Sequence, residues 1–209
     1  MEEVDKVLEA LSVVERYEEY LFRRAWGQAL VVIGTVFPLG MFVLMNADIL
    51  AVLTGTNADV VRLYANILTI VLCWGLVTYS FFNAWRTIRR EPDQESGGIL
   101  HAPLIAIIWF VSFFLTSLAP AELALVSVLW AASVSCLLSF VILHLTHSHD
   151  QEVVLLYLGV VLGFGSSLIL AFQDAAVSGV VVPLLFSACF IIAGLTMHRR
   201  ASESLKAKQ

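Results

Sequence analysis

Long stretches without a charged residue constrain this chain more than any other feature of its sequence. Only 14% of its 209 residues are charged, whereas a typical soluble domain has about 25%. Within lipid, an apolar segment must satisfy its own backbone N–H and C=O groups, and an α-helix does so within a single segment. The β-barrel alternative requires short segments of alternating polarity, which this sequence lacks. The sequence therefore predicts an all-α fold, a polytopic membrane helical bundle.

The apolar stretches predict six transmembrane helices. An amphipathic helix over residues 1–24 is expected before them, the six-helix domain covers residues 25–198, and a basic tail covers residues 199–209. The expected spans are residues 25–45, 63–85, 102–118, 122–145, 153–172 and 176–197. Because the connections between them are short, we expect no separate extramembrane catalytic domain.

The positions of lysine and arginine predict how the bundle is oriented. With six spans, every basic residue except Arg62 falls on the side that carries both termini. Cytoplasmic segments of membrane proteins carry an excess of basic residues. We therefore expect an integral protein of the cell membrane with both termini in the cytoplasm. Arg62 lies at the opposite rim, where Asp59, Glu122 and Asp174 are candidate ion-pair partners.

The N-terminal residues combine an apolar stripe with an acidic polar surface. The apolar side chains recur every three or four residues and so share one face of a helix. They are Val4, Val7, Leu8, Leu11, Val14, Tyr17 and Leu21. Helices that bind a membrane surface favour Lys and Arg, because many lipid headgroups are anionic. This acidic helix therefore predicts contact with protein, either with cytoplasmic loops of the same chain or with a separate soluble protein.

The second span carries a line of polar residues that we call the polar seam. Its members step by three and four, with Leu76 as the interruption, and are Arg62, Asn66, Thr69, Cys73, Ser80, Asn83 and Thr87. Polar side chains in a bilayer commonly hydrogen-bond to neighbouring helices. The seam therefore indicates either the bundle-facing side of a central helix or a hydrated path, with Leu76 as a dry constriction. No span has an ionisable residue near its middle, which argues against ion-coupled transport.

The fifth span carries small residues at intervals of four, namely Gly159, Gly163, Ser167 and Ala171. Such a stripe lets the backbone of another helix approach closely. It predicts helix packing, either inside the bundle or between copies in a homo-oligomer. The serines of this span have no histidine at matching depth to act as a base, so serine catalysis is not predicted.

Five histidines map to the expected cytoplasmic boundary of the bundle: His101, His144, His147, His149 and His198. Imidazoles gathered at one depth can bind zinc or another transition metal. They can also be ordinary interfacial residues, or respond to cytoplasmic pH. No other cofactor is implied by the sequence.

No motif in the chain identifies a reaction. The net charge of −5 is typical of neither DNA-binding nor RNA-binding proteins, because phosphate binding needs a basic surface. With membrane lipids around it, the chain is expected to be a non-enzymatic permease-like or scaffolding subunit of a membrane complex. The alternatives are a stand-alone channel or facilitator for a small neutral or lipidic solute, and a metal-dependent membrane enzyme that uses the histidine cluster.

Overall fold

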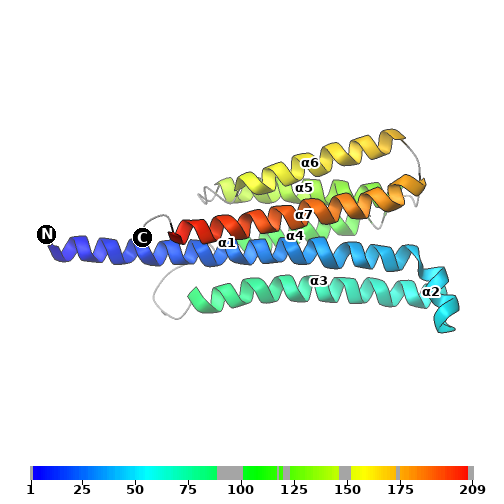
Figure 1. Ribbon diagram of the computed structural model, residues 1–209, viewed down its shortest axis with the longest axis horizontal. Coiled ribbons are helices and arrows are strands. Elements are labelled where there is room, and N and C mark those ends of the chain that lie inside the picture. The colour runs from blue at the N-terminus through cyan, green and yellow to red at the C-terminus, as the bar shows by residue number, and fades with distance from the viewer. Residues whose placement is uncertain are drawn as a thin grey trace.

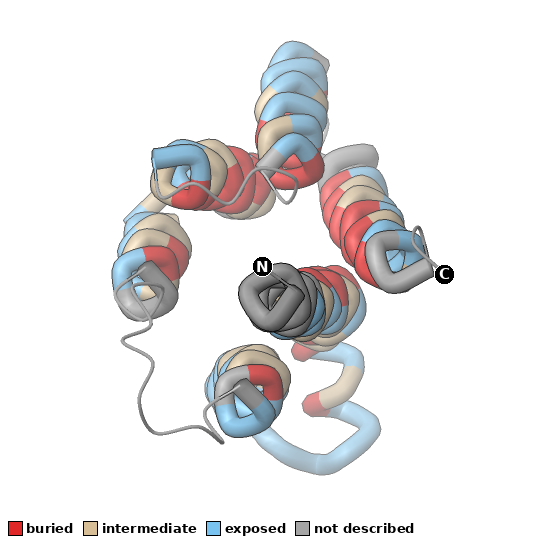
Figure 2. Tube along the Cα trace, turned by 90° about the vertical axis from the view of Figure 1, so that its left-hand side faces the viewer, coloured by how far each residue is buried: buried red, intermediate tan, exposed pale blue. Residues whose placement is uncertain are grey.

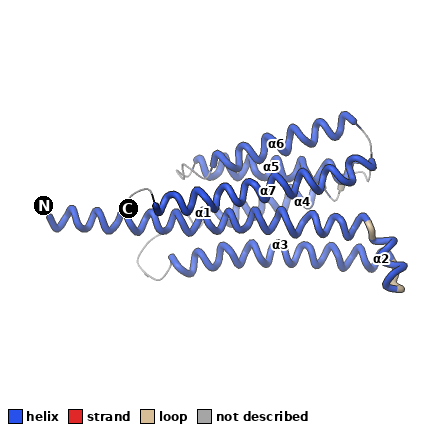
Figure 3. Tube along the Cα trace, viewed as in Figure 1, coloured by secondary structure: helices blue, strands red, loops and turns tan. Residues whose placement is uncertain are grey.

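The described part of the chain is entirely helical. The computed structural model describes residues 2–88, 101–116, 118–119, 123–145, 152–172 and 175–206. These residues form seven α-helices and no strand (Figure 3). The helices are α1 (Glu2–Met45), α2 (Ala47–Thr54), α3 (Ala58–Ile88), α4 (His101–Thr116), α5 (Ala124–Leu145), α6 (Glu152–Phe172) and α7 (Ala175–Lys206). The predicted all-α membrane bundle is confirmed.

The long helices run alternately in opposite directions along one axis (Figure 1). Consequently α1 begins and α7 ends at the same end of the bundle, which we call the terminal end. The short helix α2 lies at the other end, which we call the α2 end.

Within the described residues, five helices are long and apolar enough to cross a membrane. Their apolar segments are Tyr17–Met45, Ala58–Ala84, Leu125–Leu145, Val153–Ala171 and Gly179–Glu203. Helix α4 is also apolar but has 16 residues, which corresponds to about 24 Å at 1.5 Å per residue. The hydrocarbon core of a bilayer is about 30 Å thick. Six spans is therefore an approximate description, with five full-length helices and one shorter helix.

Helix α1 continues without interruption from the N-terminal segment into the first span. It contains 44 residues, a length of about 66 Å, roughly twice what a bilayer core requires. The boundary expected at residue 24 is therefore not a break in the helix, and the N-terminal part projects beyond the other helices (Figure 1). Helix α7 likewise continues past the expected sixth span as far as Lys206.

Helices α1 and α7 cross in close contact because glycines lie where they meet. A methyl group added at Gly27 would lie 2.8 Å from the carbonyl oxygen of Gly194, and one added at Gly194 would lie 2.6 Å from that of Gly27. Seven residues farther along α1, a methyl group added at Gly34 would lie 2.8 Å from Cβ of Phe190. Helices in lipid associate largely through such close backbone packing, so this crossing is a main structural contact of the fold.

An aromatic cluster connects α1, α4 and α7. The Phe37 ring lies 5.1 Å from Phe113 and 5.2 Å from Phe186, measured between ring centroids. Phe186 stacks on Phe190 at 4.4 Å. Trp109 is buried beside Phe190, and its Nε1–H donates a hydrogen bond of 3.0 Å to Oγ of Ser139 on α5. Four helices are therefore linked by these side chains, of which Phe37 and Phe113 are half-buried and the others buried.

Helix α3 lies at the edge of the bundle. Its main contacts are with α1 and α2, and most of its surface is exposed (Figure 2). Ala65 and Ala84 are its buried hydrophobic residues among those described. The prediction that α3 is a central helix is wrong. Its many apolar side chains face the surroundings of the bundle, as they do in a helix that faces lipid.

Candidate functional site

The middle of the polar seam packs against α1. Thr69, Cys73 and Ser80 are half-buried on the side of α3 that faces α1. The two helices are in contact at Gly40 of α1, where an added methyl group would overlap Oγ1 of Thr69. Because the two helices touch at this point, the seam is a packing surface here.

Two hydroxyl groups of the seam form hydrogen bonds within α3 itself. Oγ of Ser80 donates to the carbonyl oxygen of Leu76 at 2.9 Å, and Oγ1 of Thr87 donates to that of Asn83 at 2.9 Å. Serine and threonine often return a hydrogen bond to the preceding turn of a membrane helix. These two residues therefore need no polar partner on a neighbouring helix.

The two ends of the seam are exposed. Asn66 lies toward the α2 end, while Asn83 and Thr87 lie toward the terminal end. Leu76, the expected constriction, is 43% exposed on the surface of α3. The structure thus places the seam along one flank of an edge helix, half of it against α1 and half of it open.

Arg62 forms an ion-pair cluster at the α2 end. Its guanidinium donates to Oδ1 and Oδ2 of Asp48 at 3.0 and 3.1 Å, and to Oδ1 of Asp59 at 3.0 Å. Asp59 was one of the three expected partners, and the other two, Glu122 and Asp174, lie outside the described residues. Asp48 was not expected, because it belongs to α2 and is fourteen residues away in sequence.

The small-residue stripe of α6 divides between two environments. Gly159 and Gly163 face α5, where Oγ of Ser133 donates to the Gly159 carbonyl oxygen at 2.7 Å. A methyl group at Gly163 would lie 2.8 Å from that same Oγ atom. Ser167 and Ala171 are exposed instead. The stripe therefore supports packing inside the bundle in its first half and remains open in its second half.

The structure describes the side chains of two of the five histidines. His144 and His198 are exposed, and the His144 ring stacks on Phe140 with 5.8 Å between centroids. His101 begins α4, but its side chain lies outside the description, as do His147 and His149 altogether. The described residues contain no group of three or more His, Cys, Asp or Glu side chains placed to hold a metal ion. A metal site at this end stays a prediction.

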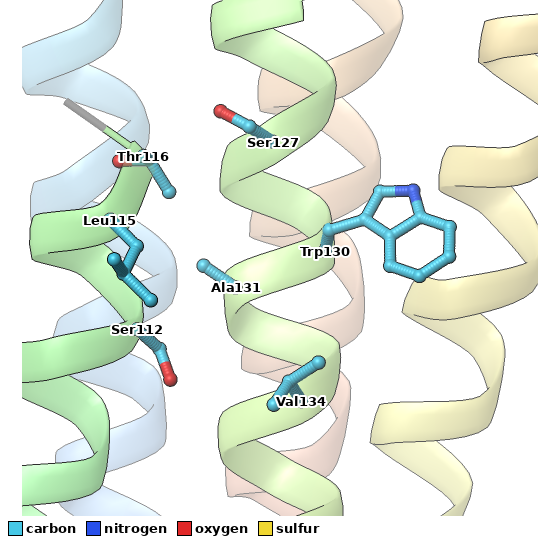
Figure 4. Close-up of a pocket in the computed structure, with 7 residues that line it drawn as sticks. All are labelled: Ser112, Leu115, Thr116, Ser127, Trp130, Ala131 and Val134. Carbon is cyan, nitrogen blue, oxygen red and sulfur yellow. The ribbon is translucent and has the colours of Figure 1, made fainter. Parts of the chain in front are cut away.

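A groove lies between α4 and α5 in the half of the bundle nearer the α2 end (Figure 4). Its volume is about 220 Å³, and it is lined by Ser112, Leu115, Thr116, Ser127, Trp130, Ala131 and Val134. Figure 4 shows the hydroxyls of Ser112 and Ser127 on opposite walls. The lining is mainly apolar and the groove is open at the surface, so it is a lipid-facing depression and not a passage through the protein.

Two features of the structure escaped the sequence interpretation. The close crossing of α1 and α7 was missed, although Gly27 and Gly34 are seven residues apart and therefore lie on one helix face. The role of Asp48 was missed because the direction of α2 is set by the turn at Asn46.

No protein-family model matches the chain, and no match is found among curated proteins or solved structures.

Proposed function

We propose that this protein is a non-enzymatic membrane subunit that holds a soluble protein at the membrane through the N-terminal part of α1. The observation that carries the proposal is the continuity of α1 beyond the bundle (Figure 1). A rigid helix that extends from a membrane-embedded bundle presents a fixed surface to the adjacent aqueous phase. The remaining helices then serve as the anchor.

The projecting part of α1 and the first residue of its apolar segment offer exposed apolar side chains. Val13, Val14 and Tyr17 are 56%, 46% and 47% exposed, and the last two belong to the apolar stripe expected on this helix. Apolar side chains at helical spacing are the usual means by which a helix binds in a groove of another protein. Because the helix is acidic, the partner that suits it has an apolar groove with a basic rim.

The packed interior supports a scaffolding role over a conducting one. The rings of Phe37, Phe113 and Phe186 occupy the space between α1, α4 and α7. The seam of α3, the other candidate path, touches α1 at Gly40. A solute path along either route would require these contacts to separate.

The distribution of charge supports an orientation with both termini in the cytoplasm. Arg23, Arg24, Arg86, Arg199 and Arg200 lie at the terminal end, while Arg62 lies at the α2 end and is paired with two aspartates. An excess of basic residues on one side favours the cytoplasm for that side. The soluble partner is therefore a cytoplasmic protein.

A photo-crosslinking experiment tests the docking surface. The photoreactive residue p-benzoylphenylalanine is placed at Val14 or Tyr17 and irradiated in native membranes. We expect both positions to crosslink to the same soluble protein, because they share one face of α1. Phe164 on α6, which is 66% exposed within a span, is the matched control and should give no soluble adduct. Equal labelling from all three positions, or none from α1, would contradict the proposal.

A further inference from the structure

We propose that α2 is a lipid-binding element that lies in the membrane interface at the α2 end, with its rotation about its own axis set by the Asp48–Arg62 ion pair. Its ligand is the acyl-chain and headgroup boundary of the adjacent lipid leaflet. This inference does not depend on the docking role proposed for α1.

The outward face of α2 is strongly apolar. Ile49, Val52 and Leu53 are 61%, 84% and 76% exposed, whereas Ala47 and Ala51 on the opposite face are 0% and 7% exposed. In a water-soluble loop, such a face would leave three large apolar side chains in contact with solvent. An interfacial helix buries such a face among the acyl chains just below the headgroups.

The direction of α2 fits a position in the plane of the interface. Figure 1 shows α2 running across the end of the bundle, at a large angle to α1 and α3. It starts after the turn at Asn46 and ends at Gly55, which has a positive φ of 66° and donates its N–H to the Ala51 carbonyl oxygen. Glycine adopts this left-handed conformation without steric cost. The two turns therefore hold a short helix in a transverse direction.

The ion pair determines which face of α2 turns outward. Asp48 lies one turn before Val52 and thus borders the apolar face. Both of its carboxylate oxygens accept hydrogen bonds from Arg62 on α3, at 3.0 and 3.1 Å. Both bonds come from Nη2 of Arg62, so this nitrogen tethers the Asp48 carboxylate to α3. With Asp48 held on α3 and the two alanines facing inward, Ile49, Val52 and Leu53 must face away from the bundle.

The apolar face of α2 adjoins the surface of α3 that faces lipid. Val60, Leu63 and Tyr64 in the first turns of α3 are 42%, 58% and 68% exposed, and α2 packs on α3. Because α3 is a membrane-spanning helix in this fold, its exposed apolar surface contacts lipid. The continuity of the two surfaces selects lipid as the occupant of the α2 face.

Spin-label accessibility tests this placement in the full-length protein in lipid nanodiscs. Nitroxides are attached to Val52→Cys, Thr56→Cys and Gly75→Cys in a protein whose three native cysteines are replaced by alanine. Thr56 lies in the exposed turn after α2, and Gly75 is an open position inside the span of α3. The measured quantity is the ratio of the label's collision rate with oxygen to its collision rate with a water-soluble nickel complex. We expect this ratio at Val52 to be higher than at Thr56 and lower than at Gly75. A ratio at Val52 equal to that at Thr56 would overturn the proposal.

Two further measurements keep the test decisive. If the cysteine-free protein does not fold, Val52→Trp and Thr56→Trp in the otherwise native chain are compared by fluorescence quenching with brominated lipids, and stronger quenching is expected at Val52.

In Arg62→Gln, the difference in accessibility between Val52 and Thr56 should decrease, because α2 can rotate. An undiminished difference would refute the role assigned to the ion pair.

Discussion

Gly194→Val is expected to destabilise the bundle by about 2 to 3 kcal/mol, since overpacking a closely packed contact costs this much. The first carbon of the new side chain would lie 2.6 Å from the carbonyl oxygen of Gly27 and 2.7 Å from a side-chain carbon of Val31. The nearest obstacle is backbone, which cannot rotate away, so α1 and α7 must separate. Unfolding by sodium dodecyl sulfate in mixed micelles, followed by circular dichroism, measures the change in free energy.

The matched control for this substitution is Gly75→Val on α3. Apart from the adjoining residues and backbone of α3 itself, no atom lies within 4 Å of the position that a methyl group would take at Gly75. The free energy of unfolding of Gly75→Val should therefore change by less than about 0.5 kcal/mol, as for most surface positions. Both variants add the same side chain inside an apolar span. Equal stability of the two variants would show that the α1–α7 crossing is not a close contact.

Phe186→Ala is expected to lower the free energy of unfolding by about 2 to 3 kcal/mol, because it leaves a cavity in the packed interior. Phe186 is fully buried and stacks on both Phe37 and Phe190. In lipid the side chain gains little from leaving water, so the loss arises from packing contacts with its neighbours. The same detergent titration measures it.

Phe164→Ala on α6 removes the same side chain from an exposed position and serves as the control. Phe164 is 66% exposed, and its truncation should cost less than about 0.5 kcal/mol. If Phe186→Ala were as mild as Phe164→Ala, the interior would not be closely packed. A conducting path between α1, α4 and α7 would then become the better description.

The fold class and most of the spans can be predicted from hydrophobicity alone. The start of α3 can be explained by the residue that caps it. Uncharged apolar stretches are long enough to locate most of the spans. Asn57, which directly precedes α3, caps this helix because its Oδ1 accepts a hydrogen bond of 2.9 Å from the Asp59 N–H. Every span must be apolar because lipid surrounds the whole bundle. The apolar stretches and the local cap can therefore be recognised without knowing which helices are neighbours.

The arrangement of the helices could not be read in the same way. In water, a helix reveals its buried face by its apolar residues. In lipid the outward face of α3 is apolar as well, so apolarity does not identify the neighbours of this helix. The sequence therefore left the seam as either the bundle-facing side of a central helix or a hydrated path, whereas the hydroxyls of Ser80 and Thr87 bond within α3. The pairing of α1 with α7 depends on glycines that are distant in sequence, and nothing local connects Gly27 with Gly194.

The candidate docking surface was only partly predictable. The apolar stripe of residues 2–24 follows from its periodicity, but its accessibility depends on where the other helices end. Exposure of Val14 and Tyr17 is a result of the length of α1 relative to its neighbours. The sequence interpretation therefore left open whether this stripe covers loops of the same chain or a separate protein.

Purification from native membranes in a mild detergent tests the central claim most directly. The full-length protein is compared with a variant that lacks residues 2–16. This deletion removes the docking residues Val13 and Val14, and it keeps the apolar segment that begins at Tyr17 and the Glu19–Arg23 ion pair. The proposal predicts that one soluble protein co-purifies in a fixed ratio with the full-length chain and is absent from the shortened one, while both bundles unfold at the same detergent fraction. Retention of that protein by the shortened chain, or its absence from both preparations, would contradict the role assigned to α1.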